Sequence, residues 1–74
     1  MAQAYTGKVI SKVGHVRRRK SLSQEDVASR LRVSRQTMSN IETGRTLPNL
    51  AMVFALADVL GVPWSTLYDY GGDE

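Results

Sequence analysis

A series of helix start and stop signals constrains this chain more than any other feature. Ser23, Ser34 and Asn49 are residue types that cap helix N-termini, and Gly44 and Gly61 are placed to end helices. The segments between these signals are short, and short helices are marginal in water unless an apolar face packs against a neighbour. No alternating strand pattern persists along the chain. The sequence therefore predicts an all-α fold in which several short helices share one core.

Five helical segments are predicted in a single domain that spans residues 1–74. They cover approximately residues 7–20, 23–31, 35–43, 50–60 and 63–68, with a core over about 7–68 and loose tails at 1–5 and 71–74. Segment 50–60 is apolar nearly all round, which predicts that it is covered on more than one side and lies at the centre of the core. Trp64 and Tyr68 either close the core or form an apolar patch on which a second copy docks.

Composition excludes several classes of site. The chain has no cysteine, which excludes disulfides, thiolate zinc sites and cysteine nucleophiles, and one histidine makes a metal cluster implausible. Ser34 has no placed base and no Gly-rich phosphate loop occurs, so we expect no enzyme, no cofactor and no small-molecule substrate. The longest apolar stretch is about half of the ~20 residues that cross a bilayer. We expect no membrane association, no signal peptide and a cytoplasmic location.

Charge is distributed unevenly along the chain. Residues 1–45 hold all ten basic residues and three acidic ones, whereas residues 46–74 hold four acidic residues and no basic one. Such asymmetry predicts that the first part faces a polyanion and the second part faces something else. The alternative is that the basic run at residues 17–20 is only a solvated helix end, where cations suit the helix dipole.

Segment 35–43 carries the residues that point most directly to a function. Arg35, Gln36, Ser39 and Asn40 recur at positions i, i+1, i+4 and i+5, which places them on one strip of a helix. Arginine pairs with guanine, glutamine or asparagine with adenine, and serine with either kind of base edge. Because the major groove of DNA accepts one helix, the strip predicts contact with base edges.

These residues lie within a longer set of motifs. The chain reads LSQEDVA at 22–28, VSRQTMSNIETGR at 33–45, PNL at 48–50 and LADVLGV at 56–62. In this order and spacing the motifs resemble the helix-turn-helix domains of the lambda-repressor-like family, which includes phage repressors, Cro and XRE-type regulators. The resemblance covers roughly residues 9–68 and implies a compact five-helix domain whose second motif helix enters the major groove.

The resemblance also implies roles for individual residues. Gln24 matches a position that reaches a phosphate and braces the recognition helix, and Arg35, Gln36 and Asn40 match base-reading positions. Thr37 and the loop at 43–46 match backbone-contact positions. The DNA-binding set implied is Gln24, Ser34, Arg35, Gln36, Thr37, Ser39, Asn40, Thr43, Arg45 and Thr46.

Two further positions bear on how the motif is held. Arg17 and Glu42 match a partly buried ion pair of the family; a structural role for Arg17 is favoured, although a phosphate contact is compatible with it. Arg32 stands where the family usually has glycine. Either the turn keeps its left-handed conformation and Arg32 is strained, or the turn is rearranged. Arg32 itself could reach a phosphate.

The leading interpretation is a sequence-specific, double-stranded DNA-binding transcriptional regulator, a repressor of bacterial or phage origin. We expect a homodimer joined through the acidic C-terminal third, because two copies read a palindromic site. The alternative is an antitoxin-type module that binds a partner protein and regulates its own expression through DNA. A single-stranded nucleic acid binder ranks lower, because the basic part of the chain has one aromatic residue, Tyr5.

Overall fold

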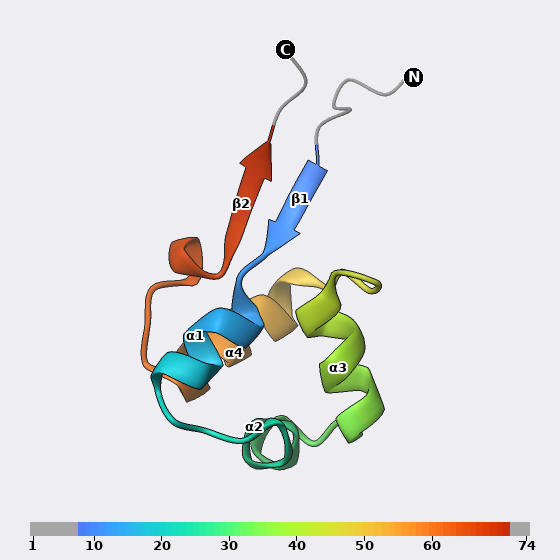
Figure 1. Ribbon diagram of the computed structural model, residues 1–74, viewed down its shortest axis with the longest axis vertical. Helices are drawn as coiled ribbons and strands as arrows, with labels where there is room; N and C mark the ends of the chain where they lie inside the picture. The colour runs from blue at the N-terminus through green and yellow to red at the C-terminus, as the bar shows by residue number, and fades with distance from the viewer. Residues whose placement is uncertain (1–7, 72–74) are drawn as a thin grey trace.

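Residues 8–71 fold into four α-helices and a two-stranded antiparallel ribbon. The computed structural model describes residues 8–71 (Figure 1). The elements follow in the order β1 (Lys8–Ser11), α1 (Val13–Arg19), α2 (Gln24–Leu31), α3 (Arg35–Thr43), α4 (Leu50–Leu60), a 3-10 helix η1 (Trp64–Thr66) and β2 (Tyr68–Gly71). The ribbon extends from one end of the molecule and α2 lies at the other.

The predicted start and stop signals of α2, α3 and α4 are confirmed. The Ser23 side chain accepts a hydrogen bond from the Asp26 backbone N–H at 2.9 Å, and Asp26 completes a capping box. Asn49 Oδ1 accepts from the backbone N–H of Met52 at 2.8 Å. Gly44 and Gly61 both end their helices in the left-handed conformation, which glycine adopts at low cost. Local chemistry therefore sets the bounds of these three helices.

The prediction of an all-α fold with five helices is wrong, because the described residues form four α-helices and a two-stranded sheet. Residues 8–11 form β1 rather than the start of a helix, and they pair with β2 in the register Val9 to Tyr70 and Ser11 to Tyr68. Only a 3-10 turn forms where the fifth helix was expected. β-Branched and aromatic side chains favour strands. The strands pair across almost the whole described chain, so no local pattern reveals them. The ribbon is anchored because the Lys12 N–H donates to the Leu67 carbonyl at 2.7 Å.

The predicted tails can be compared with the structure at one residue. Gly71 ends β2, so the expected loose tail at 71–74 begins too early. Residues 1–5 and 72–74 lie outside the described residues.

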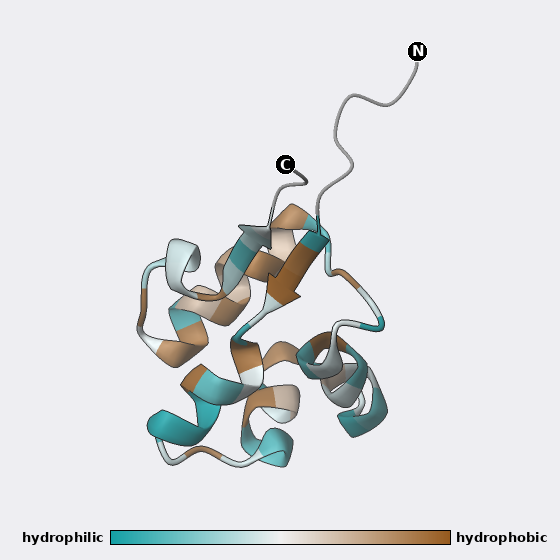
Figure 2. Cartoon of the chain, turned by 45° about the horizontal axis from the view of Figure 1, so that its top comes forward, coloured by the Kyte–Doolittle hydropathy of each residue, from teal (hydrophilic) through white to brown (hydrophobic). Residues whose placement is uncertain are grey.

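The hydrophobic core lies where α1, α2, α3 and α4 meet. Its buried members are Val13, Val27, Ala28, Met38, Ile41, Leu56, Ala57, Leu60 and Leu67. Figure 2 shows hydrophobic residues along α4 and β1, with hydrophilic ones at the end of α1. The predicted central position of α4 is only partly right, because Leu50 and Phe54 on this helix are 65% and 50% exposed. Trp64 is 55% exposed and does not close the core.

Tyr68 is the first residue of β2, and its side chain lies near the start of α4. With Val9, Leu47, Pro48 and Val53 it lines a small apolar hollow of about 130 Å³. Its hydroxyl is buried and has no hydrogen-bond partner of good geometry within the described chain. Burial raises the pKa of Tyr68 above its usual 10.0, and the neighbouring Ser11 hydroxyl offsets part of that rise.

Candidate nucleic-acid interface

The turn between α2 and α3 fixes how α3 is presented. Arg32 has φ 59° and ψ 41°, so the turn keeps the left-handed conformation although an arginine occupies it. The Val33 N–H donates to the Ala28 carbonyl at 3.0 Å, which closes the end of α2. This geometry answers the question that the sequence left open. The turn is not rearranged, and Arg32 carries the conformational cost of a non-glycine residue in this region.

A polar network ties α1, α2 and α3 together behind this turn. The Arg17 guanidinium donates to both carboxylate oxygens of Glu42 and, at 2.8 Å, to the Leu22 carbonyl. Gln24 Nε2 donates to Glu42 Oε1 at 3.0 Å. The Arg17 and Glu42 side chains are only 12% and 7% exposed. The expected ion pair is therefore present, and Gln24 braces α3 through the same carboxylate.

Gly14 contributes to this network in a way that the sequence did not indicate. A Cβ atom at residue 14 would lie 3.0 Å from Glu42 Oε1 and 3.2 Å from Arg18 Nη1. The absent side chain leaves room for the Glu42 carboxylate against α1. Sequence reasoning could not find this contact, because Glu42 lies on a distant segment of the chain.

The strip predicted on α3 faces away from the core. Met38 and Ile41 are buried, whereas Arg35 and Gln36 are exposed and Asn40 is half-buried. Gln36 Nε2 donates to Asn40 Oδ1 at 3.1 Å across one turn of the helix. The Arg35 guanidinium makes no hydrogen bond or ion pair with any described residue. The strip thus presents groups that are available to a ligand outside the chain.

A polar hollow of about 330 Å³ lies between the start of α2 and this strip. Four of the predicted residues line it, namely Gln24, Arg35, Gln36 and Ser39. The structure therefore brings together residues from two helices that the sequence analysis had grouped as one site.

The remaining predicted residues surround the strip at the two ends of α3. Ser34 caps the helix by accepting from the Thr37 N–H at 3.0 Å, and its hydroxyl donates to Thr37 Oγ1 at 2.9 Å. Thr43, Arg45 and Thr46 are exposed at the end of α3 and in the loop that follows it. Ser34 and Thr37 thus have structural tasks, while Arg45 lies open to solvent.

Further basic side chains are exposed on the two helices that precede α3. Arg18, Arg19 and Lys20 are exposed at the end of α1, and Arg30 and Arg32 are exposed at the end of α2. One basic residue of the ribbon side is paired, because Lys12 Nζ lies 3.3 Å from Asp69 Oδ1. Among residues 8–71 no group of acidic or histidine side chains is arranged to hold a metal ion, and no helix is long and apolar enough to cross a membrane.

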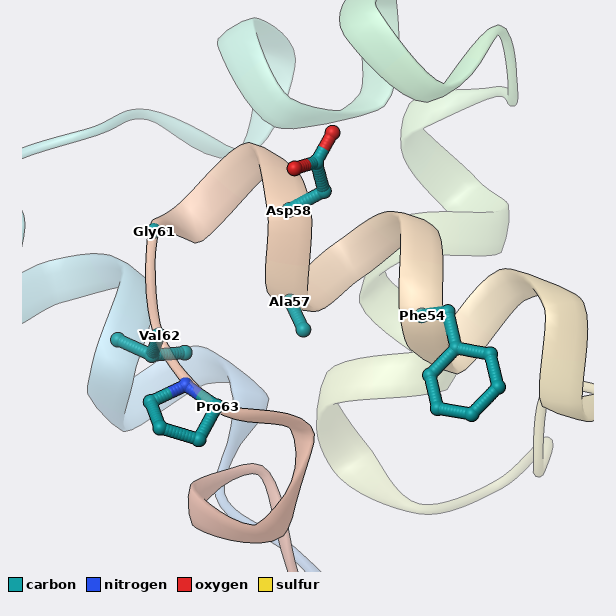
Figure 3. A pocket seen from close by; sticks show the side chains of 6 residues that line it. All are labelled: Phe54, Ala57, Asp58, Gly61, Val62 and Pro63. Atoms are coloured by element: carbon teal, nitrogen blue, oxygen red, sulfur yellow. The ribbon is translucent and has the colours of Figure 1, made fainter.

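A second, apolar surface lies on the outer side of α4. Figure 3 shows the rings of Phe54 and Pro63 on the same side of the chain with Ala57 between them, whereas the Asp58 carboxylate points away. Together with Gly61 and Val62 these residues line an open notch of about 510 Å³. The lining combines the apolar side chains of Phe54, Ala57, Val62 and Pro63 with the charged Asp58.

Two short helices joined by a tight turn, with the second helix exposed, define the helix-turn-helix class. The Helix-turn-helix domain family model matches residues 12–67, so the chain belongs to this family. An uncharacterized HTH-type transcriptional regulator of Methanocaldococcus jannaschii is 39% identical over 64 residues, which cover 86% of this chain and 97% of that protein. Another from Sinorhizobium fredii is 40% identical over 52 residues, 70% of this chain and 68% of that protein.

The fold is shared with a solved structure. A crystal structure of a Bacteroides fragilis protein, described as a candidate DNA-binding protein, superposes with a TM-score of 0.81 over 84% of this chain and 100% of that one, at 21% identity. At this identity the likeness concerns the fold alone.

Proposed function

We propose that this protein is a sequence-specific, double-stranded DNA-binding transcriptional regulator that acts as a repressor. In this proposal α3 enters the major groove and α2 crosses the backbone beside it. The observation that carries the proposal is the exposed strip of α3, a helix that is held from behind by the partly buried contacts of Glu42 with Arg17 and Gln24. Relatives named as HTH-type transcriptional regulators support the same class of function.

The proposed contacts divide into two groups. Arg35, Gln36 and Asn40 discriminate between bases, with Ser39 beside them. The second group supplies affinity through the phosphates and depends on salt concentration. Its proposed members are Gln24, Ser34, Thr37, Thr43, Arg45 and Thr46. Arg32 is a further proposed phosphate contact, because it is exposed at the turn. The proposal requires no metal, cofactor or catalytic group, and places the protein in the cytoplasm.

Selection of bound DNA from a random pool tests this function. The pool reports the preferred sequence, the half-site spacing and the symmetry together. On the selected site, we expect Gln36→Ala to cost about 1–3 kcal/mol and to relax the choice of base at one position. Arg45→Ala should instead weaken binding to all sequences alike and reduce the dependence on salt.

The controls make the test decisive. Ser29 is exposed on α2 and belongs to neither proposed contact group, so Ser29→Ala should leave binding unchanged. Equal losses on selected and random DNA for Gln36→Ala would contradict the assignment of α3 as the base-reading helix. Failure of the wild type to enrich any sequence would contradict the proposed function itself.

We further propose that the protein binds a palindromic site as a homodimer through its C-terminal third. The exposed ring of Phe54 on α4 supports this proposal, because a two-fold axis could place each Phe54 against the notch of the partner. The surface also lies outside the α3 strip. A small protein that co-purifies in a fixed ratio and occupies this surface would instead favour the antitoxin-type alternative.

A further inference from the structure

The hydrogen bond between Gln36 and Asn40 limits what Gln36 can recognise. An amide group carries one acceptor oxygen and two N–H donors. Gln36 gives one N–H to Asn40 Oδ1 at 3.1 Å, which leaves Oε1 and the second N–H unused. Both residues belong to α3 and are one turn apart, the spacing at which side chains on a helix surface meet.

The two unused groups match one base edge. Adenine presents an N6 amino donor and an N7 acceptor in the major groove, which pair with an amide oxygen and an amide N–H respectively. Guanine presents two acceptors, so the Gln36 oxygen would face O6 without a hydrogen. Cytosine offers a donor alone and thymine an acceptor and a methyl group. Of the four bases, adenine uses both groups that remain on Gln36.

The bond also reduces the freedom that binding would otherwise remove. A glutamine side chain loses rotational freedom about several bonds when it docks against a base. Holding the side chain in place beforehand lowers this entropic cost of binding. The neighbouring Arg35 has no intramolecular partner among the described residues and lacks such a restraint. The two adjacent side chains thus differ in how far they are preorganised.

We propose that Gln36 reads an adenine in each half-site and that Asn40 is a positioning residue that holds the Gln36 amide for this contact. This inference rests on the proposed function, because it names the base that the α3 strip selects. It leaves Asn40 free to make a base contact of its own through Nδ2, since only Oδ1 is engaged with Gln36.

The first experiment locates the base. Sites selected by the wild type and by Gln36→Ala are compared, and the position whose preference disappears in the variant is identified. We expect adenine at that position, with wild-type discrimination against guanine of about 5- to 150-fold. Replacing this adenine with 7-deazaadenine or with purine should weaken wild-type binding and leave Gln36→Ala unaffected.

The second experiment tests the positioning role of Asn40 at that same base. Asn40→Ala should lose most of the adenine-over-guanine discrimination, and the Gln36→Ala/Asn40→Ala double variant should lose no more than Gln36→Ala alone. Asn40→Asp keeps the acceptor oxygen, so it should retain the discrimination while its added charge weakens binding to all DNA. If Asn40 only stabilised the fold, Asn40→Ala and Asn40→Asp would not differ in their adenine-over-guanine discrimination. Ser29→Ala serves as the unchanged control.

The outcomes separate this inference from the proposed function. If the wild type enriches no sequence, both fail. If it enriches a site but the position dependent on Gln36 is not adenine, or no position depends on Gln36, only the inference is overturned. It is also overturned if Asn40→Ala keeps full discrimination, or if the losses of the two single variants multiply at this base. Thermal unfolding of each variant excludes misfolding as the cause.

Discussion

Replacing Arg17 with methionine should remove a large part of the protein's stability. The substitution keeps an apolar stem but removes the donors to Glu42 and to the Leu22 carbonyl. Glu42, with a side chain only 7% exposed, would retain only Gln24 as a donor among the described residues. Breaking a buried ion pair in this way costs about 3–5 kcal/mol. A chain of this length has a total stability of about 4–11 kcal/mol, so the loss would remove much of it.

Urea denaturation at neutral pH measures this loss. Arg19→Met makes the same chemical change at an exposed arginine two residues further along α1, and it should alter the free energy of unfolding by less than about 0.5 kcal/mol. In the Arg17→Met/Glu42→Leu double variant the unpaired carboxylate is also absent, so this variant should be more stable than Arg17→Met alone. The reasoning is refuted if Arg17→Met costs no more than Arg19→Met.

Three further predictions follow from other parts of the fold. Arg32→Gly should raise the free energy of unfolding by about 1 kcal/mol in denaturation experiments, because glycine adopts the left-handed turn without strain, while DNA binding at low salt should weaken for all sequences. The pKa of Tyr68 is raised in the folded state, so its contribution to stability is present below pH 10 and is lost as the pH rises further. Tyr68→Phe should therefore lessen the loss of stability at alkaline pH, measured by thermal unfolding at several pH values. At neutral pH it should cost nothing, because the buried hydroxyl has no good hydrogen-bond partner among the described residues. Phe54→Lys should shift sedimentation at micromolar concentration from dimer to monomer with little change in the melting temperature, and a wild type that sediments only as a monomer would contradict the proposed interface.

Structural features were predictable from the sequence when the residues that cause them lie close together in the chain. Ser23, Asn49 and Gly61 act on residues within one helical turn, so the bounds of their helices followed directly from residue type. The strip on α3 followed from spacing alone. Its base-reading role stays a prediction that binding experiments must test.

Features that join distant segments could not be found in this way. Val9 and Ile10 fit the spacing of a helix with Val13, and only the pairing with residues 68–71 makes them a strand. The Arg17–Glu42 pair was expected from the family resemblance rather than from any pattern in the chain. The contact between Gly14 and the Glu42 carboxylate depends on how α1 packs on α3, which no local window contains.

The paired ribbon determines where additional polypeptide would leave the domain. Lys8 lies opposite Gly71 in the register, so a tag, reporter or neighbouring module fused before one residue or after the other would start from the same corner. That corner lies at the opposite end of the long axis from α2 (Figure 1). Fusions before Lys8 and after Gly71 should therefore behave alike, and a linker that joins Lys8 to Gly71 could be very short. The domain is suited to insertion as a cassette within a larger host protein.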